Sequence, residues 1–170
     1  MIIRSITIDD AKAFVLLNKK LVQETDFLLM TPEETSISMQ QQKEQIAALK
    51  NSSNRMIFVA EDDGTLMGFL ETTICTPQKM NHTANFVMAV LAKNKKRGIG
   101  IALLQTAENW LQKKNVSRLE MTVMAHNIPA IAFYQKNGFV KEGVRKQAIA
   151  MNDRRYDELY MAKIFPHTQS

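Results

Sequence analysis

The sequence predicts a mixed α/β fold with one mostly antiparallel sheet. Two β-rich runs flank Asp63-Gly64, which is a strong hairpin signal. A strand, helix, strand unit over residues 83–125 predicts a central parallel pair with a right-handed crossover. The chain has 170 residues, of which 45% are apolar and 23% charged. This balance is typical of a globular protein, and we expect a single domain over residues 1–170.

The N-terminal part predicts a strand, two helices and a hairpin. Residues 2–8 alternate weakly, as a strand does. Residues 7–23 predict a helix with a Thr or Asp cap and an apolar stripe at Ala13, Leu16, Leu17 and Leu21. A loop over 25–36 precedes a second predicted helix at 36–51. Two strands follow, at 55–62 and 65–75, on either side of the hairpin signal.

The C-terminal part alternates strands and helices before it ends in two strands. We expect a strand at 83–92, an amphipathic helix at 98–115 and a strand at 117–125. A short helix at 127–138 begins at a capping Asn127 and stops at Gly138, and strands follow at 139–150 and 154–164. The predicted order is therefore β α α β β β α β α β β.

Several classes of protein are disfavoured by the composition. No apolar run approaches the roughly 20 residues that span a bilayer, and the N-terminus lacks a secretory pattern, so we expect a cytoplasmic protein without membrane contact. Cys75 is the single cysteine, and His82, His126 and His167 are scattered, so no metal site is predicted. The net charge of +5 favours an anionic partner, but no nucleic-acid-binding motif accompanies it.

The stretch KNKKRGIGIALL, residues 93–104, combines cations, two glycines and the start of a helix. The first N–H groups of a helix lack intrahelical partners, and Gly98 and Gly100 let an anion approach the backbone. The segment is built like a diphosphate cradle. A tight turn with solvated lysines is the alternative. The dinucleotide pattern G-x-G-x-x-G fails at Leu103, and the Walker pattern is absent.

The residues KKRGIG resemble the Q/R-x-x-G-x-G/A signature of the GCN5-related N-acetyltransferases, with Lys95 in place of Gln or Arg. The residues HNIPAIAFYQKNGFV resemble the second coenzyme-binding segment of that family. The resemblance covers nearly the whole chain, and the C-terminal strands are similar to the bacterial phosphinothricin and amino-acid acetyltransferase branch. It implies that the central parallel pair is splayed to admit acetyl-coenzyme A (acetyl-CoA).

The resemblance also implies roles for individual residues. The main chain of Met88 and Val90 would pair with the pantetheine arm, and the N–H near Val90 would stabilise the thioester oxyanion. Asn127 would bind the coenzyme arm. Tyr134 would contact the coenzyme and act as general acid, because a phenol stays protonated at neutral pH. The pyrophosphate would be bound by a set of loop residues: Lys95, Lys96, Arg97, Gly98, Ile99, Gly100 and Ile101.

The general base is less clearly indicated. Glu120 and Glu24 are the candidates, each with an ordinary structural carboxylate as its alternative, and Glu71 is a further carboxylate in a strand. The resemblance to the phosphinothricin type implies a carboxylate at the position that Asn85 occupies here. The Asn85 side chain cannot accept a proton. Deprotonation through water, or a neutral amine, would make a base unnecessary.

The function implied is direct transfer of acetyl from acetyl-CoA to a primary amine. An amino-acid-like molecule, a polyamine and a protein amine are the acceptor classes. A non-catalytic acetyl-CoA sensor of the same fold is the alternative, and a homodimer is compatible with the terminal strands.

Overall fold

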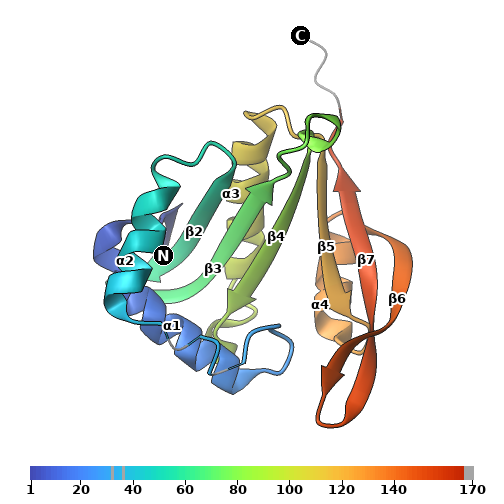
Figure 1. Cartoon of the computed structure of the whole chain (residues 1–170), viewed down its shortest axis with the longest axis horizontal. Coiled ribbons are helices and arrows are strands. Elements are labelled where there is room, and N and C mark those ends of the chain that lie inside the picture. The colour runs from blue at the N-terminus through green and yellow to red at the C-terminus, as the bar shows by residue number, and fades with distance from the viewer. Residues whose placement is uncertain (32, 36, 167–170) are drawn as a thin grey trace. The chain divides into compact units, whose positions relative to one another are not determined.

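The computed structural model describes residues 1–31, 33–35 and 37–166. Within these residues the sheet has seven strands in the order β1-β2-β3-β4-β5-β7-β6 (Figure 1). The predicted order of elements and the mixed, mostly antiparallel fold are confirmed. The elements are β1 (Ile2–Ser5), α1 (Ala11–Glu24), α2 (Met39–Leu49), β2 (Arg55–Asp62), β3 (Thr65–Ile74), β4 (Thr83–Val90), α3 (Ile99–Gln112), β5 (Arg118–Met124), α4 (Ile128–Lys136), β6 (Val140–Met151) and β7 (Arg154–Ile164).

The chain folds into two compact units. The first contains Met1–Thr73 and Val87–Trp110, and the second contains Ile74–Phe86 and the chain from Leu111 onward. Strand β4 and helix α3 each contribute residues to both units. No helix among the described residues is long and apolar enough to cross a membrane.

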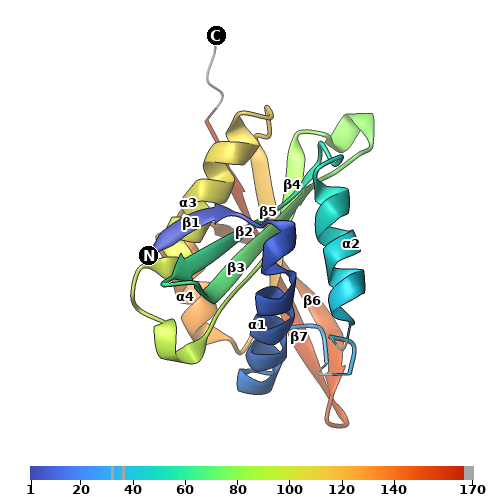
Figure 2. The same ribbon diagram turned by 90° about the vertical axis from the view of Figure 1, so that its left-hand side faces the viewer.

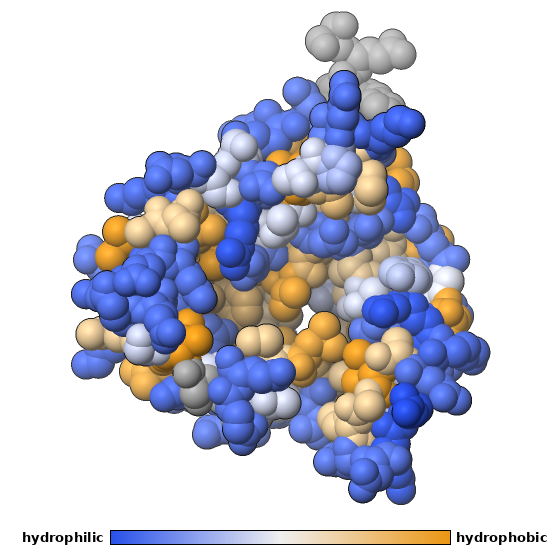
Figure 3. Space-filling model, viewed as in Figure 1, coloured by the Kyte–Doolittle hydropathy of each residue, from blue (hydrophilic) through white to orange (hydrophobic). Residues whose placement is uncertain are grey.

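In the first unit, α1 and α2 cover one face of β1–β3 and α3 covers the other (Figure 2). Strands β1, β2 and β3 are antiparallel neighbours, with Arg4 opposite Val59 and Phe58 opposite Leu70. The ring of Phe14 from α1 meets the edge of Phe69 from β3 at 5.2 Å between centroids. The surface over α2 is hydrophilic (Figure 3), so the apolar side of this helix is the side that packs inward.

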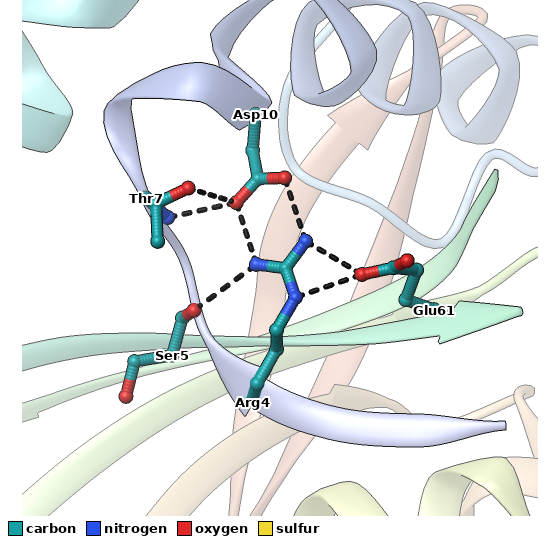
Figure 4. Close-up of polar contacts among 5 residues, drawn as sticks. All are labelled: Arg4, Ser5, Thr7, Asp10 and Glu61. Atoms are coloured by element: carbon teal, nitrogen blue, oxygen red, sulfur yellow. Dashed lines mark hydrogen bonds and ion pairs between the residues drawn. The ribbon is translucent and has the colours of Figure 1, made fainter. Parts of the chain in front are cut away.

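The first helix has an Asp cap, which is one of the two caps that the sequence allowed. Residues Ile8–Asp10 form a 3₁₀ turn, and α1 starts at Ala11 with Asp10 as its N-cap. Asp10 accepts hydrogen bonds from the Thr7 backbone N–H at 2.8 Å and the Thr7 hydroxyl at 2.9 Å, while Arg4 donates to both of its oxygens at 2.7 Å (Figure 4). Arg4 also pairs with Glu61 on β2. This non-local cluster holds the 3₁₀ turn that precedes α1.

The apolar stripe predicted for α1 is partly wrong. Leu17 and Leu21 are buried, together with Ala11 and Phe14, but Leu16 is 50% exposed. Leu16 is adjacent to Leu17, and a helix turns by about 100° per residue, so the two cannot both face the core. The second helix is also shorter than predicted, because Ser38 and Gln41 form a capping box that starts it at Met39.

In the second unit, β7 lies between β5 and β6 and is antiparallel to both. The parallel ladder joins Thr83–Asn85 of β4 to Arg118–Glu120 of β5, which confirms the predicted parallel pair. Helix α4 lies against one face of β5 and β7 (Figure 1). Glu120, Thr122 and Met124 alternate with the buried residues Leu119, Met121 and Val123, so they belong to the opposite face of the sheet.

Candidate active site

The glycine loop joins β4 to α3 and contains two residues in the left-handed region. Lys96 has φ of 62° and Gly98 has φ of 79°. A Cβ atom added to Gly98 would meet nothing within 4 Å, so the backbone angle and not the available space requires glycine here. Gly100 lies in the first turn of α3.

The backbone N–H groups from Lys96 to Ile101 donate no hydrogen bond within the described part of the chain. The first helical bond of α3 runs from the Ala102 N–H to the Gly98 carbonyl at 3.1 Å, and the Lys95 N–H is already bonded to the Ala92 carbonyl at 3.2 Å. Consecutive free donors that include left-handed residues and a helix N-terminus form an anion-binding concavity. This row of donors fits a pyrophosphate.

The segment before this row is anchored firmly to the rest of the first unit. The Leu91 N–H donates to the Met67 carbonyl at 2.9 Å. Buried Asn94 donates its amide to the Met67 sulfur at 3.3 Å, and its side-chain oxygen is buried without a hydrogen-bond partner. Glu24, at the end of α1, accepts a 2.7 Å hydrogen bond from the Ala92 N–H. Glu24 therefore tethers the loop through its carboxylate.

The loop cations differ in their surroundings. Lys95 and Lys96 are exposed and form no ion pair with any described residue. Arg97 lies 3.6 Å from Asp62, whose pKa is lowered chiefly by a hydrogen bond from the N-terminal ammonium group and further by Arg97. Lys95 and Lys96 are consequently the cations whose charge is least compensated by the protein.

Met88 and Val90 are half-buried on β4, and a glycine of β3 allows the close approach of their segment. A Cβ atom added to Gly68 would lie 2.6 Å from the Ala89 carbonyl oxygen and 3.0 Å from a Val90 methyl carbon. Gly68 is not among the residues predicted from the sequence to form the site. A glycine inside a β-rich run was the available signal, since it often marks close backbone approach.

Tyr134 lies in an aromatic cluster of the second unit. Its ring centroid is 5.8 Å from that of Phe86 on β4, and it also contacts Phe133 and Phe139. Burial raises the pKa of Tyr134 to about 12, because the apolar surroundings disfavour the phenolate. The hydroxyl makes no hydrogen bond with any residue that the structure describes. Such a phenol keeps its proton throughout the physiological pH range.

Asn127 caps α4, as predicted. Its side-chain oxygen accepts a hydrogen bond from the Ala130 N–H at 3.4 Å. Gly138, with φ of 89°, follows the helix at the predicted stop. The capping bond uses the oxygen of Asn127 and leaves its amide N–H groups as donors.

The carboxylates considered as bases have cationic or backbone partners. Glu120 accepts a 2.7 Å hydrogen bond from Arg118, and Asn85 is its direct neighbour across the parallel ladder. A carboxylate thus stands beside Asn85. Glu71 is paired with Arg55 at 2.6 Å.

The predicted lack of a metal site is not tested by the fold. His126 stacks on Tyr156 at 4.7 Å, and His167 lies outside the described residues. Among the residues that the structure does describe, no group of three or more His, Cys, Asp or Glu side chains has the arrangement of a metal site.

Comparison with known proteins identifies the family. The family model "Acetyltransferase (GNAT) domain" matches residues 3–160. The L-amino acid N-acetyltransferase of Escherichia coli strain K12 is 36% identical over 110 residues, which cover 62% of this chain and 66% of that protein, just under two thirds. An acetyltransferase of the GNAT family from Streptococcus pneumoniae has a TM-score of 0.90 at 25% identity and covers 97% of this chain and 99% of its own.

A further similar structure was solved with the coenzyme. The yncA protein of Salmonella typhimurium, with its cofactor acetyl-CoA, has a TM-score of 0.85 at 15% identity and covers 100% of this chain and 96% of its own. At that identity the likeness shows the shared fold alone. Because the family model extends from β1 into β7, the chain belongs to the GCN5-related N-acetyltransferase (GNAT) family of acetyltransferases, as its two motifs predicted.

Proposed function

We propose that this acetyltransferase transfers the acetyl group of acetyl-CoA directly to the primary amine of an amino-acid-like molecule. The row of unbonded N–H groups from Lys96 to Ile101 is the observation that supports acetyl-CoA binding. The acceptor class is supported by the similarity to the Escherichia coli L-amino acid N-acetyltransferase. Polyamines and protein amines are the other acceptor classes that this chemistry would serve.

The residues of the glycine loop would hold the coenzyme. Their N–H groups would bind the pyrophosphate, with added charge from Lys95 and Lys96. Arg97 would contribute less, because it already faces Asp62. The main chain of Met88 and Val90 would pair with the pantetheine arm, and Asn127 would donate an amide N–H to it.

Tyr134 would act as the general acid of the transfer. Acetyl-CoA supplies an acetyl thioester, which the neutral amine nitrogen attacks at its carbonyl carbon. The Val90 N–H would stabilise the negative charge that develops on the carbonyl oxygen. As the carbon–sulfur bond breaks, Tyr134 would give its hydroxyl proton to the sulfur and recover a proton from solvent.

Glu120 is the better candidate for the base of the reaction. It lies beside Asn85 in the parallel ladder, and it would accept the amine proton directly or through water. Arg118 holds its carboxylate through a 2.7 Å hydrogen bond. Glu24 is committed to the Ala92 N–H, so a positioning role suits it better.

Release of coenzyme A thiol in the presence of candidate amines tests the proposal. We expect release that depends on both acetyl-CoA and an α-amino acid, with an acetylated product of the expected mass. Binding of acetyl-CoA without release for any amino acid, polyamine or peptide amine would favour the sensor alternative, which the Asn at position 85 motivates. A cytoplasmic location, a homodimer and independence from metal remain predictions of the sequence.

A further inference from the structure

Glu158 on β7 is a buried carboxylate that belongs neither to the proposed coenzyme site nor to the apolar core. The Glu158 side chain is 3% exposed. It accepts a 2.7 Å hydrogen bond from Arg145 on β6 and a 3.1 Å hydrogen bond from the Thr122 hydroxyl on β5. Three adjacent strands therefore contribute to one polar cluster in the second unit.

Stability alone is a poor explanation for this pair. Desolvation of a buried ion pair offsets much of its attraction, and apolar residues of similar volume often serve equally well. The neighbouring positions of β7 bury Leu159, Met161 and Ala162 without any polar group. An apolar residue in place of Glu158 could not orient the Arg145 guanidinium group, whereas the carboxylate can.

Arg145 is held on two sides although its side chain is 45% exposed. Glu158 binds one of its terminal nitrogens, and the ring of Tyr160 lies under the guanidinium with 5.7 Å between the guanidinium carbon and the ring centroid. The other terminal nitrogen and Nε make no hydrogen bond within the described residues. A fixed guanidinium with free donors matches a carboxylate.

The cluster lies at the end of β5 that leads to the coenzyme-binding candidates. Glu158 is paired with Arg145 on one side and with Met124 on the other. Met124 is the last residue of β5 and precedes Asn127 by three positions. Arg145 therefore lies in register with the end of β5, just before the helix that carries Tyr134 begins.

We infer that Arg145 binds the carboxylate of the acceptor and that Glu158 positions Arg145 for this contact. The inference rests on the proposed transfer to an amine and narrows the acceptor to amines that carry a carboxylate, such as α-amino acids. The Arg145–Glu158 pair is neutral as a whole, so recognition depends on hydrogen-bond geometry more than on net charge.

Kinetics with a matched pair of acceptors test the contact. The best α-amino acid substrate is compared with its own carboxamide in the wild type, in Arg145→Gln and in the control Lys141→Gln, an exposed cation on the same strand. We expect Arg145→Gln to lower kcat/KM for the amino acid by about 10- to 100-fold, mainly through KM, and to leave the carboxamide nearly unchanged. Equal losses for both acceptors would overturn the inference.

Two further variants separate binding from folding. Arg145→Gln leaves Glu158 buried without a cation, so Arg145→Gln/Glu158→Gln provides a neutral pair that should fold and show the same loss of discrimination. Glu158→Gln alone should raise KM for the amino acid and leave kcat and the carboxamide unaffected. A Glu158→Gln variant with wild-type KM would contradict its positioning role.

A binding measurement distinguishes failure of this inference from failure of the proposed function. Calorimetry compares the N-acetyl amino acid with its N-acetyl carboxamide, which requires no turnover. Binding that depends on Arg145 and on the carboxylate, without acetylation of any amine, would refute the transfer and support the carboxylate site. Acetylation that proceeds with no preference for the carboxylate would support the transfer and refute the site.

Discussion

Tyr134 is the residue on which the proposed chemistry depends most directly. The prediction is that Tyr134→Phe lowers kcat by about 100-fold or more, because the ring still packs on Phe86 while the proton donor is lost. The dissociation constant for acetyl-CoA should change little. Steady-state kinetics and calorimetry on the same preparation check this. A Phe variant with wild-type kcat would remove Tyr134 from the mechanism.

The raised pKa of Tyr134 also affects stability at high pH. The buried phenol has a pKa of about 12 in the folded chain, above the usual value of 10. The unfolded chain therefore ionises first as the pH rises. The contribution of this group to stability is complete below about pH 10 and is lost as the pH rises toward 12.

Asp10 makes the opposite contribution, at low pH. Its pKa is lowered to about 2, chiefly by the hydrogen bond from Arg4. The stability that it provides is present above its usual pKa of 3.8 and is lost as the pH falls through 2. We expect Asp10→Asn to reduce the free energy of unfolding at pH 7 by roughly 1–3 kcal/mol.

Denaturant unfolding at pH 7 and at pH 2.5 measures this effect. The difference between Asp10→Asn and the wild type should shrink at the lower pH, while the exposed neighbour Asp9→Asn serves as the control. A difference that is the same at both pH values would show that the ion pair with Arg4 is not its source.

At the scale of elements, Gly68 is the point at which β3 closely approaches β4, the strand proposed to pair with the coenzyme. Gly68→Ala would place a methyl group 2.6 Å from the Ala89 carbonyl, so β4 must shift near Val90. We predict weaker acetyl-CoA binding and lower stability for this variant. Gly143→Ala is the control, because its added methyl group would meet only Tyr160, at 3.9 Å. Unchanged binding in Gly68→Ala would show that this approach is irrelevant to the coenzyme.

The elements show what the sequence could and could not predict. The place of the glycine loop before α3, the Asn127 cap and the hairpin at Asp63-Gly64 are set by neighbouring residues, and each was predicted correctly. The choice between a Thr cap and an Asp cap for α1 was left open, because it depends on Arg4 and Glu61, which are far apart in sequence and hold the 3₁₀ turn before the helix. Gly68 and the Arg145–Glu158 pair were missed for the same reason. Their significance depends on contacts between strands.

For the whole molecule, the single domain predicted over residues 1–170 leads to an expectation about unfolding. Strand β4 and helix α3 each belong to both units, so neither unit can lose these elements without affecting the other. We predict one transition in denaturant, with coincident curves from circular dichroism and from Trp110 fluorescence. Two separate transitions would show that the units fold independently.

The central claim is that the row of N–H groups from Lys96 to Ile101 binds acetyl-CoA, and calorimetric titration tests it most directly. Gly98→Asp places a carboxylate in this row, while Gly64→Asp is the matched control, since Gly64 has a similar φ of 72° and equally open surroundings in the hairpin. We expect micromolar binding by the wild type and by Gly64→Asp, and at least 100-fold weaker binding by Gly98→Asp. Equal binding by all three proteins, or none by the wild type, would contradict it.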